Sequence, residues 1–248
     1  MDLISVIIPY FKKKNFIETT IKSVLNQTYK HFEIILIYDD NDFSELEFLK
    51  KLNQSDTRIK IILNKKNLGA GESRNKGIEK SAGKYIAFLD ADDIWNEKKL
   101  ELQLNFMKSN NFDITHCSYH IVDKDNKILG IRIARDFDNL NSLLKSCDIG
   151  LSSVMLKKEI LNNEYKFPKL KTKEDFVLWL TLLKNDYKIF GLNKILVKWQ
   201  KSKNSLSSSS FQKIIDGFRV YRIYMKYNIT YSLYLLLCLC LNYLKKND

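Results

Sequence analysis

Lys84-Tyr85-Ile86-Ala87-Phe88-Leu89-Asp90-Ala91-Asp92-Asp93 is the stretch of this sequence that says most about the fold. The segment up to Leu89 is almost entirely apolar, as is typical of a buried strand, and three carboxylates follow directly after it. A helix is expected from about Asn96 onward. Carboxylates crowded at the end of a strand repel one another, so a positive charge is expected close to them.

Two interpretations of these carboxylates are open on local sequence alone. A divalent cation that carries a phosphorylated substrate would fit, because Mg²⁺ and Mn²⁺ prefer hard oxygen ligands and often share them with substrate phosphates. The alternative is an Asp-rich turn that caps the next helix, since Asp is a favoured turn and N-cap residue. The isolated motif favours the turn, so the surrounding sequence has to decide.

Length and charge narrow the possible functions. A chain of 248 residues can bury one sizeable core, and we expect one main domain. Lys and Arg total 41 against 29 for Asp and Glu, and the resulting net charge of +12 predicts attraction to anions. Nucleotide-sugar phosphates, anionic lipid head groups and nucleic acid all satisfy this criterion.

Cysteine usage indicates the compartment. The four cysteines form no CxxC pair, and no charged-then-apolar leader precedes residue 4. These features predict a reducing, cytoplasmic setting.

Strand-like and helix-like segments alternate along the first ninety residues. Helical spacing covers 15–25, 44–52 and 71–81, and strand-like runs cover 4–8, 33–38, 58–63 and 84–89. This alternation predicts an α/β fold with a mostly parallel central sheet flanked by helices. In such sheets ligands bind beyond the carboxyl ends of the strands, which is where Pro9-Tyr10, Asp39-Asp40 and Asp90-Ala91-Asp92 fall.

Seven short segments in order along the chain resemble the motifs of family 2 glycosyltransferases. They are Ser5-Val6-Ile7-Ile8-Pro9-Tyr10, Ser23-Val24-Leu25-Asn26-Gln27-Thr28-Tyr29, Asn67-Leu68-Gly69, Arg74-Asn75-Lys76-Gly77, Phe88-Leu89-Asp90-Ala91-Asp92-Asp93, Lys173-Glu174-Asp175-Phe176-Val177-Leu178-Trp179-Leu180 and Asn204-Ser205-Leu206-Ser207. The resemblance implies the Rossmann-like GT-A fold and the transfer of a sugar from a nucleotide donor to an acceptor hydroxyl, usually with inversion.

The resemblance also implies which residues bind the nucleotide donor: Pro9, Tyr10, Asp39, Asp40, Arg74, Asp90 and Ala91. Asp39 would accept a hydrogen bond from a pyrimidine imide. The family more often has two acids at the end of this strand, whereas Tyr38 takes the first place here, so either Asp39 or Asp40 could face the base. Arg74 suits a diphosphate, and the alternative for it is a solvated charge on a helix.

By the same resemblance, Asp92 is the expected metal ligand, and Asp90 lies nearer the ribose or the waters of the ion. Alternation along an extended loop places residues i and i+2 on one side, so both carboxylates can face the same diphosphate. The expected cofactor is therefore Mn²⁺ or Mg²⁺.

Asp175 is the expected catalytic base, because inverting transfer needs a carboxylate that takes the proton of the acceptor hydroxyl. Glu174 and Trp179 are possible contacts for the donor sugar or the acceptor. One alternative for Asp175 stays open: Thr172-Lys173-Glu174-Asp175 matches the S/T-x-x-D/E pattern of a helix start, which would give Asp175 a capping role only.

The C-terminal segment differs in composition from the rest. We expect a catalytic domain at 1–207 and a helical extension at 208–248, with the boundary in the serine run 205–210. The apolar stretch 233–241 is well short of the ~20 residues needed to span a bilayer. It predicts either a helix packed on the domain or an anchor at the inner face of the cytoplasmic membrane, because its flanks are basic and aromatic.

These expectations converge on a metal-dependent, inverting glycosyltransferase of surface-polysaccharide, lipopolysaccharide or capsule synthesis. The expected donor is a UDP-sugar, and the acceptor is a saccharide or a lipid-linked hydroxyl. A polyprenyl-phosphate sugar synthase is an alternative within the class. From another class, a non-catalytic protein that binds nucleic acid or polysaccharide would also be basic, but Lys and Arg follow no known nucleic-acid-binding motif, so nucleic acid is not expected as a partner.

Overall fold

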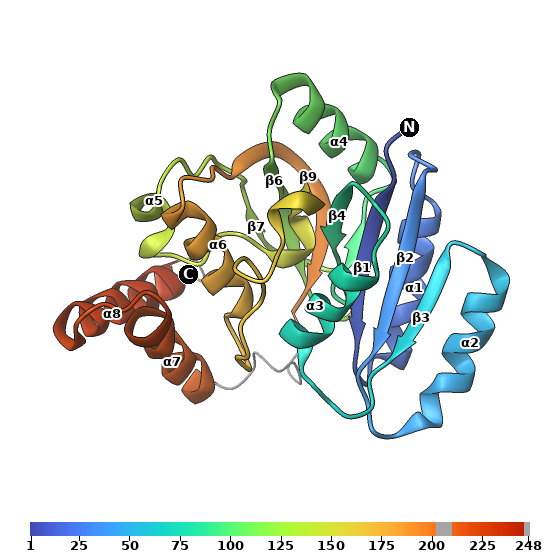
Figure 1. The fold of residues 1–248 in the computed structure, drawn as a ribbon, viewed down its shortest axis with the longest axis horizontal. Helices are drawn as coiled ribbons and strands as arrows, with labels where there is room; N and C mark the ends of the chain where they lie inside the picture. Colours follow the sequence, from blue (N-terminus) through green and yellow to red (C-terminus); the bar gives the residue numbers. More distant parts are fainter. Residues whose placement is uncertain (202–209, 246–248) are drawn as a thin grey trace.

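The computed structural model describes residues 1–201 and 210–245, and Figure 1 shows their arrangement. The expected domain boundary at residues 207 and 208 and the motif at 204–207 lie outside the described residues. The described strands form one sheet with the order β3-β2-β1-β4-β8-β6-β9-β5, and β7 pairs with β6. The described helices pack around this sheet (Figure 1).

The N-terminal half of the sheet is parallel, as the sequence predicts. β1 pairs in parallel with both β2 and β4, and β2 pairs in parallel with β3. Its elements are β1 (Ile4–Tyr10), α1 (Lys14–Leu25), β2 (Phe32–Tyr38), α2 (Leu46–Ser55), β3 (Ile59–Leu63), α3 (Ala70–Lys80) and β4 (Tyr85–Phe88), with a short 3₁₀ turn η1 (Phe43–Glu45) before α2.

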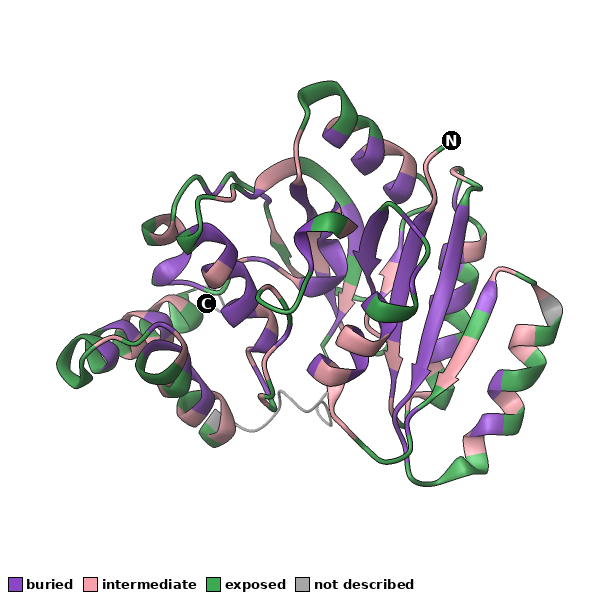
Figure 2. Ribbon diagram, in the orientation of Figure 1, coloured by how far each residue is buried: buried purple, intermediate pink, exposed green. Residues whose placement is uncertain are grey.

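Alternate residues of β1 face opposite layers. Ile7 packs in a core cluster with Ile78 of α3, whereas Val6 and Ile8 pack in a second cluster with Ile17 of α1. α1 and α3 therefore cover opposite faces of the sheet, and Figure 2 shows the strands between them as buried. Because helices cover both faces, these strands are apolar along almost their whole length, which is the pattern from which they are predicted.

The second half of the sheet is mixed. β8 (Met155–Lys157) runs antiparallel to both β4 and β6 (Ile114–Val122), and β9 (Phe190–Gln200) runs parallel to β6. β7 (Ile128–Arg132) forms a hairpin with β6, and Asn126 has φ 62° in the turn between them.

The helix expected from about Asn96 begins three positions later. β5 (Ile94–Trp95) pairs with β9, and α4 (Lys99–Asn110) follows it. The Asn96 side chain accepts a hydrogen bond from the Lys98 amide at 3.0 Å, so a turn of its own precedes the helix.

The remaining helices lie on the α3 side of the sheet and at its far end. They are α5 (Leu140–Leu144), α6 (Glu174–Lys184), α7 (Ser210–Arg219), the π-helical turn η5 (Val220–Tyr224) and α8 (Ile229–Lys245), with 3₁₀ turns η2 (Leu151–Ser153) and η3 (Lys158–Ile160). Tyr221, Leu235 and Leu239 share a core cluster with α6. One face of the C-terminal extension is thus packed on the domain (Figure 1).

Candidate active site

Arg74 of α3 joins two acidic segments that are distant in the sequence. Its Nη1 donates to Glu174 Oε1 at 2.6 Å, and its Nη2 donates to Asp90 Oδ1 at 2.7 Å. The Arg74 residue is only 3% exposed, which excludes the interpretation of a solvated helix charge. Both carboxylates raise the pKa of Arg74 and so keep it charged despite burial. The acidic loop after β4 and the start of α6 therefore form one site.

The close approach of α3 to this region depends on a glycine. A Cβ at Gly71 would lie 3.0 Å from the Pro168 carbonyl oxygen and 3.3 Å from Glu174 Cγ. Gly69, directly before the helix, has φ 87°, a conformation that favours glycine. The two glycines let the first turn of α3 reach both the loop at 167–174 and the end of β2.

The acidic loop is fixed on both of its sides. Thr20 Oγ1 of α1 donates to the Ala91 carbonyl oxygen at 3.0 Å, and the Asp90 amide donates to Ser152 Oγ at 3.0 Å. Asp93 turns away from the other two carboxylates and is buried: it accepts hydrogen bonds from Ser152 Oγ at 2.5 Å and from the Gln200 amide at 2.8 Å. Burial, with the charges of Asp92 and Asp90, raises the pKa of Asp93 well above its ordinary value.

Asp92 has a different counter-ion from its neighbours. Lys13, the residue before α1, places Nζ 2.5 Å from Asp92 Oδ2, and the two side chains are 22% and 13% exposed. Burial raises the pKa of Asp92, and Lys13 opposes that rise. Asp92 is thus held at the edge of the site by a single flexible cation.

Asp92 also contributes to the wall of a small cavity of about 150 Å³. Its other lining residues come from α1, the β6–β7 turn and the ends of β5 and β9: Asn15, Phe16, Thr19, Ile94, Lys124, Asn126 and Gln200. By volume this space holds roughly five water molecules. It has room for one polar group or hydrated ion and is far too small for a whole nucleotide sugar.

Among residues 1–201 and 210–245, no group of three or more His, Cys, Asp or Glu side chains could hold a metal ion by itself. Asp90 and Asp92 nevertheless suit Mg²⁺ or Mn²⁺, because such ions are often bound by one or two carboxylates and complete their shell with substrate phosphates and water. The hard oxygen donors and the cavity beside Asp92 fit that mode of binding.

Asp39, at the end of β2, is held by the segment before α3. Its Oδ1 accepts hydrogen bonds from Asn64 Nδ2 at 2.8 Å and the Leu68 amide at 2.7 Å, and its Oδ2 accepts one from the Gly69 amide at 2.8 Å. Asp40 Oδ1 accepts only from the Asp42 amide, at 3.1 Å, among the described contacts. Asp39 therefore fixes the segment before α3. Neither carboxylate uses all of its lone pairs in these hydrogen bonds, so each could still accept one from a nucleotide base.

The side chain of Tyr10 points into the core. Its side chain is fully buried, stacks on Tyr38 with ring centroids 5.6 Å apart, and donates to Glu45 Oε2. Pro9 and Phe11, on the opposite side of the chain, are partly exposed. The expected contact between Tyr10 and a nucleotide is thus not met, and Pro9 and Phe11 occupy the positions that can touch a base.

Asp175 lies in the first turn of α6, beside the Arg74 bridge. Its Oδ1 accepts a hydrogen bond from the Phe176 amide at 2.7 Å. Burial first, and then the charge of Glu174, raise the pKa of Asp175 to about 7, against the opposing effect of Arg74. A carboxyl group with a pKa near neutrality can accept a proton in the working range of most enzymes.

The helix-start pattern at residues 172–175 does not form a capping box. Thr172 donates through its amide and Oγ1 to Asp216 Oδ2 of α7, at 3.1 and 3.0 Å, and α6 has no side-chain N-cap. Trp179, further along α6, is fully buried against Phe167, with ring centroids 6.4 Å apart. The structure therefore places Trp179 in the core, which does not fit the expected contact with a sugar or an acceptor.

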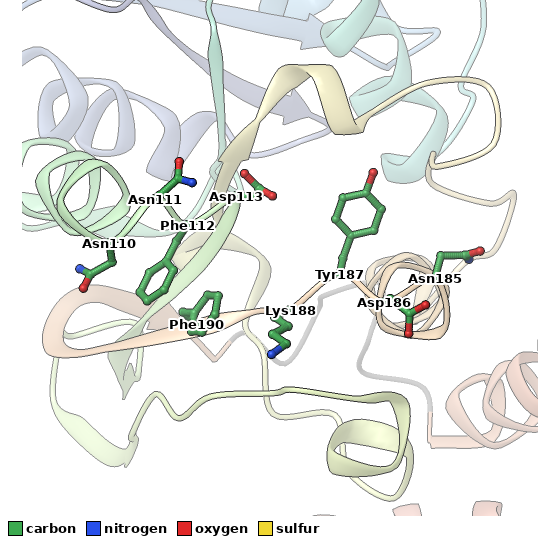
Figure 3. Close-up of a pocket in the computed structure, with 9 residues that line it drawn as sticks. All are labelled: Asn110, Asn111, Phe112, Asp113, Asn185, Asp186, Tyr187, Lys188 and Phe190. Carbon is green, nitrogen blue, oxygen red and sulfur yellow. The ribbon is translucent and has the colours of Figure 1, made fainter.

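A larger cavity than the one beside Asp92 lies elsewhere. This cavity of about 480 Å³ lies between the C-terminal ends of α4 and α6, and the ring centroids of Phe112 and Phe190, which line it, are 3.5 Å apart. Figure 3 shows the residues that line it. It borders the starting ends of β6 and β9, whereas Asp90 and Asp92 follow the carboxyl end of β4. None of the predicted site residues lines it.

Known proteins resemble this chain in sequence. The sequence model described as Glycosyl transferase family 2 matches residues 5–164. The chain is 38% identical over 213 residues to UDP-Glc:alpha-D-GlcNAc-diphosphoundecaprenol beta-1,3-glucosyltransferase WfgD of Escherichia coli, with 86% of this chain and 82% of that protein covered. It is 33% identical over 221 residues to the putative teichuronic acid biosynthesis glycosyltransferase TuaG of Bacillus subtilis (strain 168), with 89% and 87% covered.

Solved structures share the fold. S. aureus TarS in complex with UDP-GlcNAc superposes with a TM-score of 0.75 at 19% identity, over 95% of this chain and 70% of that chain. The mannosyltransferase PcManGT of Pyrobaculum calidifontis, in complex with GDP-Man and Mn²⁺, gives a TM-score of 0.67 at 11% identity, over 94% and 69%. At these identities the likeness concerns the fold alone.

Proposed function

We propose a reaction for this chain, which belongs to glycosyl transferase family 2 and is a glycosyltransferase. It moves a sugar from a UDP-sugar to an acceptor hydroxyl, with inversion and with the help of a divalent cation. The observation that carries the proposal is the Arg74 bridge, which places the acidic loop at Asp90 next to Glu174 and Asp175. Donor-binding and proton-accepting groups are thereby adjacent.

Asp175 acts in this proposal as the general base. It takes the proton of the acceptor hydroxyl while the hydroxyl oxygen forms a bond to the anomeric carbon of the donor sugar. The bond between that carbon and the diphosphate oxygen breaks on the opposite face, and the nucleotide diphosphate leaves. The raised pKa of Asp175, about 7, supports this role, because a more acidic carboxyl would be a weaker base.

Asp92 and Asp90 are the residues that would hold the divalent cation, which would offset the negative charge on the leaving diphosphate. Pro9, Phe11 and either Asp39 or Asp40 would hold the base. The printed names and complexes of two similar proteins, WfgD with UDP-Glc and TarS with UDP-GlcNAc, support a uridine nucleotide. Lys and Arg side chains near the site would add attraction for its phosphates.

The acceptor in this proposal is a saccharide on a lipid carrier, made for a surface polysaccharide such as lipopolysaccharide or capsule. Support comes from the names of the relatives: WfgD is described as acting on GlcNAc-diphosphoundecaprenol, and TuaG as serving teichuronic acid synthesis. A lipid carrier would bring the reaction to a membrane surface.

Membrane contact through α8 belongs to the same proposal. Within residues 1–201 and 210–245, no helix is both long and apolar enough to cross a bilayer. The outer face of α8 nevertheless exposes Ile229, Leu233, Leu237 and Leu241, four residues apart, while Leu235 and Leu239 on its inner face are buried. Lys145 and Lys213 lie over the rings of Tyr234 and Tyr243 at the border of this face. An apolar stripe with basic and aromatic borders suits the interface of an anionic membrane.

Nucleotide binding tests the donor and metal parts of the proposal. UDP, GDP, ADP and CDP are each added with and without Mn²⁺, and the melting temperature is measured for the wild type and for Asp92→Asn. A rise with UDP that requires Mn²⁺ and is lost in Asp92→Asn is the expected result, since a ligand of the folded state raises Tm. Wild-type protein that is folded but responds to no nucleotide would contradict the proposal.

A further inference from the structure

Lys13 is the one cation in direct contact with Asp92 among the described residues, and it reaches Asp92 from another element. Its backbone is fixed, because the Lys13 carbonyl oxygen accepts hydrogen bonds from the Phe16 and Ile17 amides at the start of α1. α1 in turn is tied to the acidic loop through Thr20 and Ala91. The backbone of Lys13 is therefore held in place next to Asp92, while its flexible side chain carries the ammonium to the carboxylate.

The other two acids that form ion pairs at the site have a different partner. Asp90 and Glu174 both bind Arg74, which is buried and planar, and its two donors are fixed in position. Lys13 is partly exposed and carries a compact charge on four rotatable carbons, so it can leave its partner at little cost. The metal-binding acid is thus paired with the more easily displaced of the two cations.

A divalent cation and the Lys13 ammonium compete for the same place. Nζ lies 2.5 Å from Asp92 Oδ2, and an ion such as Mg²⁺ binds a carboxylate oxygen at about 2.0–2.1 Å. Two cations on one oxygen repel each other, so binding of the ion requires Lys13 to move away. The donor phosphates that share the ion would offer the ammonium new anionic partners.

We propose that Lys13 is an internal counter-ion that holds Asp92 when neither metal nor donor is bound, and that it becomes a ligand of the donor diphosphate once the metal takes its place. This inference rests on the proposed function, since it requires a metal and a nucleotide diphosphate at Asp92. It adds a donor-binding residue outside the motifs that the sequence identifies. The inference also predicts that the metal ion binds weakly when no donor is present. In that case the ion displaces the Lys13 ammonium, and the ammonium finds no new anionic partner.

The test is Lys13→Met, which keeps the length and the apolar stem of the side chain and removes its charge. Free Mn²⁺ is measured by electron paramagnetic resonance during titration of the protein without nucleotide. The variant is expected to bind Mn²⁺ about tenfold more tightly than the wild type, the size of effect expected for removing one charge-assisted hydrogen bond from the ligand. At saturating Mn²⁺, calorimetry should show UDP binding weakened by about the same factor.

Two matched variants control for charge and position. Lys13→Arg keeps the cation and should bind Mn²⁺ no more tightly than the wild type. Lys14→Met removes a neighbouring charge that lies over Phe48, away from Asp92, and should change neither affinity. A pair with only a structural role would lower the melting temperature of Lys13→Met and leave both affinities unchanged.

The outcomes separate this inference from the proposed function. If wild-type protein binds neither Mn²⁺ nor UDP, the proposed function fails and the inference falls with it. If the wild type binds both but Lys13→Met has the same Mn²⁺ affinity, only the displacement of Lys13 is overturned. If Mn²⁺ binding tightens and UDP binding is unchanged, the transfer of Lys13 to the diphosphate is overturned.

Discussion

Arg74 and Glu174 are one hundred positions apart in the sequence, and their side chains are joined at 2.6 Å inside the protein. Because Arg74 also binds Asp90, a single guanidinium sets the distance between the acidic loop and the helix that carries Asp175. The site is therefore held together by one buried residue with two partners.

Replacing Arg74 by Met should destabilise the fold by about 3–5 kcal/mol, because it leaves two buried or half-buried carboxylates without their cation. The measurement is urea unfolding at neutral pH. Arg58→Ala is the control: Arg58 and Asp56 form a partly exposed pair at 2.7 Å, whose loss should cost at most about 1 kcal/mol. Equal effects of the two variants would show that Arg74 does not hold the site.

Asp175→Asn should lower kcat by about 10²–10⁴-fold, because an amide cannot accept the proton of the acceptor hydroxyl. UDP binding in Mn²⁺ should stay unchanged, since Asp175 is not a donor ligand in the proposed mechanism. Asp125→Asn, in the exposed β6–β7 turn, serves as the control for loss of one carboxylate.

The pH dependence of the wild type follows from the same residue. The base must be deprotonated, and the pKa of Asp175 is raised to about 7, so kcat should rise with pH up to a plateau above neutrality. A profile that is flat across this range, in enzyme whose chemical step limits kcat, would exclude Asp175 as the base.

Asp93 should make the wild type less stable as pH rises. Its pKa in the folded state lies well above the ordinary value of 3.8, so the folded state binds a proton that the unfolded state has already lost. This contribution to stability is complete below pH 3.8 and disappears as pH rises through the folded-state pKa. The difference in unfolding free energy between wild type and Asp93→Asn should therefore shrink or change sign with rising pH, and a constant difference would contradict the burial of a protonated Asp93.

Removing apolar side chains from the outer face of α8 should abolish membrane binding and leave the fold intact. The variant carries Leu233→Ser, Leu237→Ser and Leu241→Ser, and its binding to vesicles of anionic phospholipid is measured by flotation. Each buried Leu contributes about 1.5–3 kcal/mol, so the partition coefficient should fall by far more than tenfold.

Leu235→Ala is the matched control on the inner face of α8. Leu235 is fully buried, so its truncation should cost about 2–5 kcal/mol of stability and leave vesicle binding of the folded protein unchanged. Truncation of the whole extension is a poor test, because Tyr221, Leu235 and Leu239 belong to the core. Equal vesicle binding by wild type and the triple variant would exclude α8 as the membrane contact.

The first four strands could be predicted because their pattern is local. Each is a run of apolar residues long enough to be recognised, and each is followed by a helix or a turn with its own signals. β5 and β8 contain two and three residues, too few to show any period, and their pairing depends on tertiary contacts. β9 includes Asn193 and Lys194 and pairs with β6 through register shifts, so its sequence does not alternate regularly.

The site was predictable where chemistry is concentrated in a motif. Arg74 joins the acidic loop at Asp90 to Glu174, the residue before Asp175, although the roles of these acids remain predictions. Lys13 could not be distinguished from Lys12 and Lys14, since only the fold decides which lysine reaches Asp92. Ser152, which binds both Asp90 and Asp93, gives no sequence signal at all. The inward direction of Tyr10, by contrast, follows from strand alternation with Pro9.

The core cluster that surrounds α6 contains both Ile7 and Leu239. During translation the N-terminal strands leave the ribosome first, but this cluster cannot close until the last helix has emerged. Thr172, which precedes the proposed base by three residues, likewise cannot form its hydrogen bond to Asp216 until α7 has been synthesised. A nascent chain therefore has its strands long before it has a completed catalytic centre, so transfer should begin only after synthesis has passed α8.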